Sequence, residues 1–184
     1  MIEVEFTAAD YRRIRFAFSA VGEAVKSLRV LSAGRRSGLH GRWLAWLATI
    51  GIATDVDLGL LTAVIRPQGY LPDFLGPLPP GRHVGFEEGL AQVAATPAEI
   101  VRDELAHLAG HAVAQQGEGR DQRVALMQRL VADPDRALGR IVAELERYWE
   151  LAVEPHWPRI HALLQADLAY RLDELGAGGA ERPA

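Results

Sequence analysis

The pattern of apolar and polar positions along the chain predicts one short strand followed by a series of helices. Residues 2–6 alternate apolar and acidic side chains, a period of two that is typical of a half-buried strand. From Thr7 onward, apolar residues recur at the three- and four-residue spacing of amphipathic helices. Because no hairpin partner follows residues 2–6, we expect this strand to pair with a second copy of the chain or with another domain.

Helix starts are marked by side chains that can accept a backbone N–H, followed by an acid or a proline. Such starts stand at Thr7 with Asp10, at Ser19, at Asp55 or Asp57, at Thr96-Pro97 and at Asp133-Pro134. Together with the apolar periods they predict helices that begin at residue 8 and that cover 19–33, 43–50, 58–65, 86–95, 97–112, 120–132, 134–149 and 159–175. The inward-facing set includes Ile100, Leu163 and Leu172. The fold is thus predicted to be mostly α, with roughly eight helices and a short N-terminal β-strand.

Residues 67–83 form the longest stretch without a helical period, and five of them are prolines. A structureless segment of this length is uncommon in a compact domain. Tyr70, Leu71, Phe74 and Leu75 make it too apolar for ordinary disorder. We therefore expect this loop to be ordered against the body of the protein.

The composition limits the class of protein. A chain of 184 residues with 49% apolar and 24% charged residues can bury one core and is short for two domains. We expect one helical domain over residues 1–175 and a flexible tail or linker over 176–184. The absence of cysteine excludes a disulfide scaffold and thiolate metal sites. No apolar run approaches a membrane span, and the acidic start is unlike a signal peptide, so a cytoplasmic location is predicted.

The charge distribution and the motif content give no direct sign of nucleic-acid binding or catalysis. The net charge is −4 although the first 50 residues are basic, and no recognition helix is visible. The sequence lacks a nucleophile elbow, a P-loop and a dinucleotide-binding glycine motif. These observations predict that the chain is not an enzyme and needs no cofactor.

One spacing resembles a metal site and keeps an enzymatic alternative open. His107 and His111 stand four residues apart on one helical face, and Glu104 precedes them by one turn. Two imidazoles and a carboxylate in this arrangement suit zinc. The glutamate that follows the first histidine in zinc hydrolases is replaced by Leu108. Histidines at the edge of an apolar stripe explain the same spacing without a metal.

The strongest functional signal is apolar and aromatic. The candidate ligand-binding residues are the aromatic and polar side chains of the 67–83 loop and of the proline-flanked elbow at 154–160, namely Tyr70, Asp73, Phe74, Trp149, His156 and Trp157. Ligand pockets are mostly apolar with a few directed polar groups, so these residues favour a site for a small hydrophobic or aromatic effector. The same residues equally fit a packed core or the seam of a homodimer.

Four segments together resemble the N-terminal region of bacterial ArsR-like winged-helix transcriptional regulators. They are IEVEFTAADYRRIRFAFS at 2–19, GYLPDFL at 69–75, TPAEIVRDEL at 96–105, and YWELAVEPHWPRI at 148–160 followed by LLQAD. The resemblance implies that a helical domain comes first and that a winged helix-turn-helix, absent from this chain, follows and contacts DNA. It transfers no ligand-binding residues.

The function that this resemblance implies is an effector-sensing or dimerisation domain of a transcriptional regulator, acting as a homodimer. Two alternatives stay open from the residues alone. One is a metal-dependent hydrolase built on Glu104, His107 and His111, and the other is a pure homodimerisation module without a ligand.

Overall fold

The computed structural model describes residues 7–11, 13–33, 41–49, 58–114 and 120–178, and in these residues the predicted mostly α fold is confirmed. The α-helices are α1 (Ala8–Tyr11), α2 (Ala20–Ala33), α3 (Gly41–Thr49), α4 (Gly59–Val64), α5 (Phe86–Ala94), α6 (Ala98–Ala114), α7 (Arg120–Ala132), α8 (Pro134–Tyr148) and α9 (Trp157–Gly178). The remaining elements are the strands β1 (Phe18–Ser19) and β2 (His83–Val84), the 3₁₀ helices η3 (Asp73–Leu75) and η5 (Glu154–His156), and the π-helix η4 (Trp149–Val153). No helix in the described ranges combines the length and the apolar character needed to cross a bilayer.

Three of the predicted helix starts are confirmed by their hydrogen bonds. At α1 the Thr7 backbone N–H donates to Asp10 Oδ2 (2.9 Å), and the Asp10 N–H donates back to Thr7 Oγ1 (3.4 Å), which completes a capping box. At α2 and α8 the side chains of Ser19 and Asp133 each accept a backbone N–H from three residues later, at 3.0 and 3.2 Å. The expected caps at Asp55 and Asp57 lie outside the described residues.

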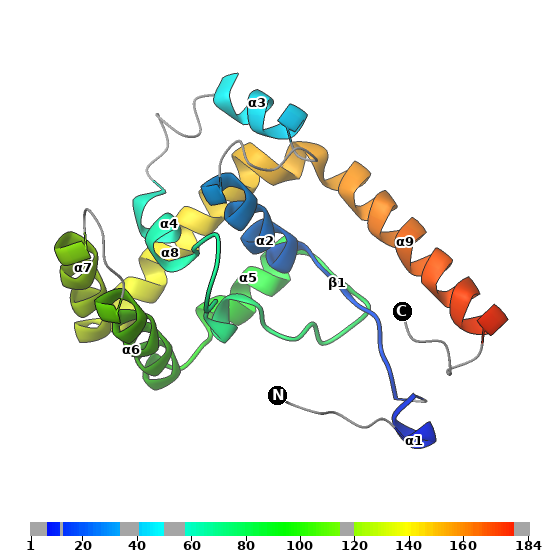
Figure 1. Cartoon of the computed structure of the whole chain (residues 1–184), viewed down its shortest axis with the longest axis horizontal. Helices are drawn as coiled ribbons and strands as arrows, with labels where there is room; N and C mark the ends of the chain where they lie inside the picture. The colour runs from blue at the N-terminus through cyan, green and yellow to red at the C-terminus, as the bar shows by residue number, and fades with distance from the viewer. Residues whose placement is uncertain (1–6, 12, 34–40, 50–57, 115–119, 179–184) are drawn as a thin grey trace.

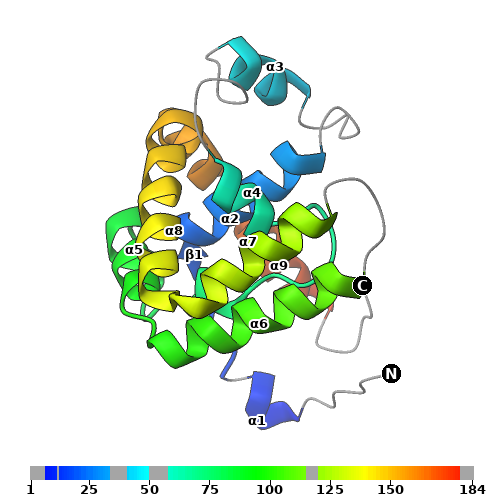
Figure 2. The ribbon, with the colours of Figure 1, turned by 90° about the vertical axis from the view of Figure 1, so that its left-hand side faces the viewer.

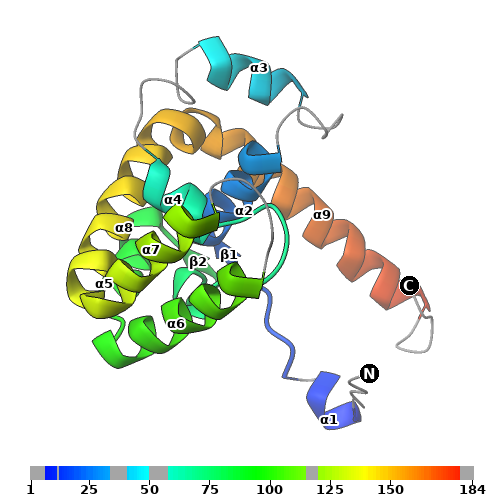
Figure 3. The same cartoon turned by 60° about the vertical axis from the view of Figure 1, so that its left-hand side comes forward.

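Five helices of the body pack against one side of α8, and its other side is exposed. This helix packs against α2, α4, α5, α6 and α7, and α6 and α7 form a helical hairpin beside it (Figure 2). Figure 3 shows α3 set above this bundle and α9 running away from it. α8 can contact all five helices because one of its faces is continuously apolar: Ala137, Leu138, Ile141, Leu145 and Tyr148 are all buried.

The first part of the 67–83 loop packs against this body, as predicted, whereas Leu78 in its second part is 91% exposed. Leu75 is fully buried, Phe74 nearly so, and Tyr70 and Leu71 are half-buried against the core. The loop ends in β2, which pairs in parallel with β1 through Phe18–His83 and Ser19–Val84. The strand predicted at residues 2–6 lies outside the described part of the chain.

Three residues expected inside are exposed. Ile100 is 43% exposed on α6, and Leu163 and Leu172 are 62% and 44% exposed on α9. The reason on α9 is its direction: from η5 onward it extends from the bundle, so of its apolar residues up to position 174 only Leu168 is buried (Figure 1). A helical period identifies an apolar face but does not say that another element covers it.

α8 and α9 belong to one helical run that bends at the elbow. Because Pro155 has no backbone N–H and its ring obstructs the preceding turn, a regular α-helix cannot continue through it. The chain widens into the π-helix η4 before Pro155 and tightens into the 3₁₀ helix η5 at it. α9 then begins at Trp157 and ends at Gly178, a little beyond both predicted ends.

Candidate functional site

The candidate site is built on the turn that follows α4. Arg29 on α2 holds this turn: its Nε donates to the Arg66 carbonyl (2.9 Å), and its NH2 group donates to the Gly69 carbonyl (2.8 Å). Gly69 has φ of 92°, a conformation that glycine adopts without steric cost. This turn brings Tyr70 against α6.

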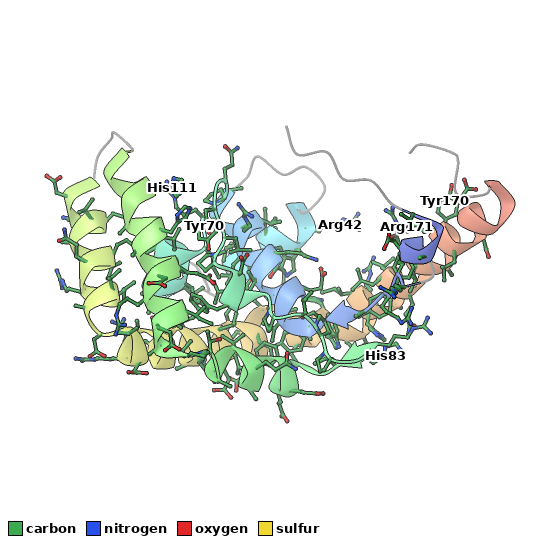
Figure 4. The ribbon with its side chains drawn as sticks, turned by 90° about the horizontal axis from the view of Figure 1, so that it is seen from below. Arg42, Tyr70, His83, His111, Tyr170 and Arg171 are labelled. Atoms are coloured by element: carbon green, nitrogen blue, oxygen red, sulfur yellow. The ribbon has the colours of Figure 1, made fainter. Side chains whose placement is uncertain are left out.

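Tyr70 joins the loop to the two histidines of α6. Its ring meets that of His107 edge-on, with centroids 4.5 Å apart, and stacks near that of His111 at 6.4 Å. Figure 4 shows Tyr70 and His111 close together. Burial raises the pKa of the Tyr70 hydroxyl, and the negative charges of Glu104 and Asp73 raise it further. Tyr70 therefore stays neutral and can serve as a hydrogen-bonding group.

Glu104 on α6 binds the backbone of the loop. Its Oε2 accepts the backbone N–H of Phe74 at 3.3 Å, so the carboxylate caps the start of η3. A cap of this kind satisfies a backbone donor that a helix start leaves without a partner. Glu104 thus helps to fix the loop that carries Tyr70.

The three residues of the metal-site alternative do not converge. Nε2 of His107 and Nε2 of His111 lie 3.0 Å apart, at hydrogen-bonding distance. Glu104 instead faces Phe74 and Tyr70. Among the residues that the structure describes, no group of three or more histidine, aspartate or glutamate side chains is placed to hold a metal ion. Both histidines are exposed on α6, which agrees with the interpretation that they lie at the edge of an apolar stripe and bind no metal.

A small cavity opens beside Tyr70, with a volume of about 80 Å³. Its apolar side is formed by Ala63, Leu108 and Met127, from α4, α6 and α7. Its polar side is formed by Arg66, Gln68, Tyr70, His111 and Arg123. An apolar floor with a few polar groups at its edge is the usual composition of a ligand site.

The two arginines give the edge of this cavity a positive charge. Burial lowers the pKa of Arg66, and the nearby positive charge of Arg123 lowers it further. Both arginines also have interactions within the protein. A negatively charged or hydrogen-bond-accepting group placed between them would reduce the repulsion between the two guanidinium groups.

The elbow residues of the predicted ligand site form a second, separate group. Trp149 stacks on Phe86, with centroids 4.3 Å apart and planes 5° from parallel, and Trp157 meets Trp149 edge-on at 5.3 Å. His156 packs against Trp46 at 4.5 Å. Nε2 of His156 is buried and has no hydrogen bond in the described part of the chain. These ring contacts fix the bend between α8 and α9.

The structure thus divides the six predicted site residues. Tyr70 lines the cavity, Asp73 is the first residue of η3 and does not line it, and Phe74 is only 5% exposed and packs in the core. Trp149 and Trp157 of the elbow pack against each other, and Trp149 and His156 also pack against Phe86 and Trp46. Sequence reasoning missed Arg66, Arg123 and Met127, because residues from three helices meet at this cavity without any spacing along the chain that announces it.

Comparison with known proteins returned no match: no family model, curated protein or solved structure is similar enough to this chain to guide its interpretation.

Proposed function

We propose that the chain is the ligand-sensing part of a bacterial transcriptional regulator of the kind it resembles, and that the cavity beside Tyr70 holds the effector. The observation that carries this proposal is the composition of the cavity: an apolar floor at Leu108 and Met127 below a positively charged edge at Arg66 and Arg123. Binding there would bridge α4, α6, α7 and the loop, so it would alter how these elements pack.

The size of the cavity favours a small effector. A cavity of roughly 150 Å³ takes a benzene ring, whereas this one measures about 80 Å³. We therefore propose a short aliphatic molecule with a carboxylate or a similar acceptor group. Its methylene groups would contact Met127 and Leu108, and its oxygens would face Arg66, Arg123 and His111. An arginine guanidinium suits a carboxylate because it can donate two parallel hydrogen bonds.

A thermal-shift panel of short carboxylates, amides and alcohols tests the effector site. A ligand at about 100 times its Kd adds roughly 2.7 kcal/mol, which raises Tm by about 5–10 °C for a chain of this size. The substitution Ala63→Phe fills the cavity and should abolish the shift. Ala143→Phe, at an exposed position of α8, should leave the shift unchanged.

Two results would contradict this site. One is a panel in which no compound raises Tm. The other is a shift of equal size in the Ala63→Phe protein, since that would place the ligand elsewhere.

The proposed regulatory role rests on the resemblance. The coding sequence that follows residue Ala184 in the gene tests it. A reading frame that continues past Ala184 into a winged helix-turn-helix supports it. A stop codon directly after Ala184 would contradict it, and the chain would then be a small-molecule binding protein without a DNA-binding domain.

A further inference from the structure

α9 carries an apolar stripe that nothing in the described part of the chain covers. Beyond the turn η5, α9 has only sparse contacts with the body, and Figure 1 shows it extending away from the bundle. Its inner side lies over a groove of about 500 Å³ that the segment Ile14–Ala17 and Leu168 help to line. The stripe lies on the other side of the helix.

The stripe is defined by the positions 159, 163, 166, 170 and 174, which follow one another at three- and four-residue spacing. Positions so spaced share one face of an α-helix. All five residues are exposed, and the two large apolar ones are the most notable: Leu163 is 62% and Tyr170 is 64% exposed. Figure 4 marks Tyr170 on the part of α9 that is remote from the bundle.

Complementary residue types stand at symmetric positions along the stripe. Leu163 and Tyr170 lie equally far from the midpoint between Ala166 and Asp167, and so do Arg159 and Glu174. In a two-fold symmetric contact, residue i of one copy meets residue j of the other, and j meets i. The stripe therefore complements itself when two copies run antiparallel, since arginine then faces glutamate and leucine faces tyrosine.

We infer that α9 pairs with α9 of a second copy, antiparallel, about a two-fold axis between Ala166 and Asp167. Leu163 packs on the partner's Tyr170, and Arg159 faces the partner's Glu174, each contact occurring twice. A parallel pair would place Arg159 beside the partner's Arg159 and Glu174 beside the partner's Glu174. The charges therefore select the antiparallel direction.

The centre of the contact is also suited to close approach. Ala166 is small, so the two helices can cross there without large side chains between them. Asp167 lies next to the axis, but Arg171 of the same helix pairs with it at 2.7 Å and offsets its charge. Exposed ion pairs are individually weak, so association rests on the burial of Leu163 and Tyr170, and the charges set the register. This inference does not depend on the effector cavity.

Sedimentation velocity of the full chain over a range of concentrations tests this pairing. We expect a dimer of the 20.1 kDa chain. Leu163→Asp should give a monomer, while Gln165→Asp, exposed on the side of α9 that carries Leu168, should leave the dimer intact. Circular dichroism of both variants checks that the helices remain folded.

Charge reversal tests the register. Arg159→Glu and Glu174→Arg should each weaken the dimer about tenfold, because two attractive contacts become repulsive. The double variant should return to wild-type affinity. A monomer at all concentrations, or a dimer that Leu163→Asp leaves intact, would overturn the inference. Disruption by Leu163→Asp without rescue in the double variant would overturn the antiparallel register.

Discussion

Two glutamates show how single side chains join distant parts of this protein. Glu104 on α6 caps η3, and Glu144 on α8 accepts the Leu61 N–H of α4 at 3.0 Å. α4 has Leu58 at its N-cap position, with no side-chain cap hydrogen bond of its own, so Glu144 replaces a local cap. Neither capping role could be predicted from the sequence, which suggested a metal site for Glu104, because the donors that the two glutamates serve lie 30 and 83 residues away.

Glu144→Ala should destabilise the protein by about 1–2 kcal/mol, since the start of α4 then loses a charged acceptor. In a chain of this length, that loss lowers Tm by roughly 2–8 °C. Glu146→Ala, two residues along the same helix and exposed, is the matched control and should stay within about 0.5 kcal/mol of wild type. Thermal melts of the two variants make the comparison, and equal melting temperatures would show that Glu144 does not act as a cap.

The buried hydroxyl of Tyr148 makes the stability of the fold depend on pH in the alkaline range. Its hydroxyl lies 2.8 Å from Ser27 Oγ, and burial raises its pKa above the ordinary value of 10.0. Below pH 10 both the folded and the unfolded chain keep the phenol proton. Above it the unfolded chain loses this proton first, so the stability present below pH 10 declines as the pH rises.

Tyr148→Phe should therefore cost about 1 kcal/mol at neutral pH, through the lost Ser27 hydrogen bond. It should also make the decline of stability above pH 10 shallower than in wild type. Urea denaturation at pH 8 and near pH 11 measures both effects. Parallel declines in wild type and Tyr148→Phe would contradict this role of Tyr148.

At the scale of elements, the sequence predicted the helices well because their signals are local. The capping box at Thr7, the serine before α2 and the Asp133-Pro134 start all fall within a few residues of the bonds that they make. What is not local was missed: Ile100 and Leu163 belong to apolar stripes, yet none of the described elements covers them. The elbow was predicted from its prolines, but its π-helix was not, because its wider turn leaves no distinct pattern.

Gly89 marks a close approach between α2 and α5. A Cβ added at Gly89 would lie 2.9 Å from Cγ2 of Val21, a fully buried and β-branched residue that cannot rotate away easily. The steric conflict in Gly89→Ala should therefore destabilise the protein by about 1–3 kcal/mol. The higher helix propensity of alanine offsets up to about 1 kcal/mol of this loss.

Gly139→Ala on α8 is the control for this prediction, since a Cβ there meets nothing within 4 Å. It should stabilise the protein by about 0.5–1 kcal/mol. Chemical denaturation compares the two variants. A Gly89→Ala protein as stable as Gly139→Ala would mean that α2 and α5 do not depend on this close contact.

At the scale of the whole molecule, the sequence identified Tyr70 but not the site around it. The aromatic loop stood out by composition, whereas the cavity needs α4, α6 and α7 to meet, and Arg66 lies 57 residues from Arg123 along the chain. The sequence also suggested the elbow tryptophans Trp149 and Trp157 as ligand-binding residues. In the structure their ring contacts stabilise the bend between α8 and α9. Aromatic residues therefore marked two places in the chain, and only Tyr70 adjoins the cavity that we propose for the effector.

Met127 offers the most direct test of that cavity. It lines the cavity from α7, and the chain has only one other methionine, Met1. With ¹³C labels in the methionine methyl groups, titration with butyrate should shift the Met127 resonance to saturation and leave that of Met1 in place. If butyrate and the other short carboxylates leave the Met127 resonance unmoved, or move both methionines alike, the cavity beside Tyr70 is not an effector site.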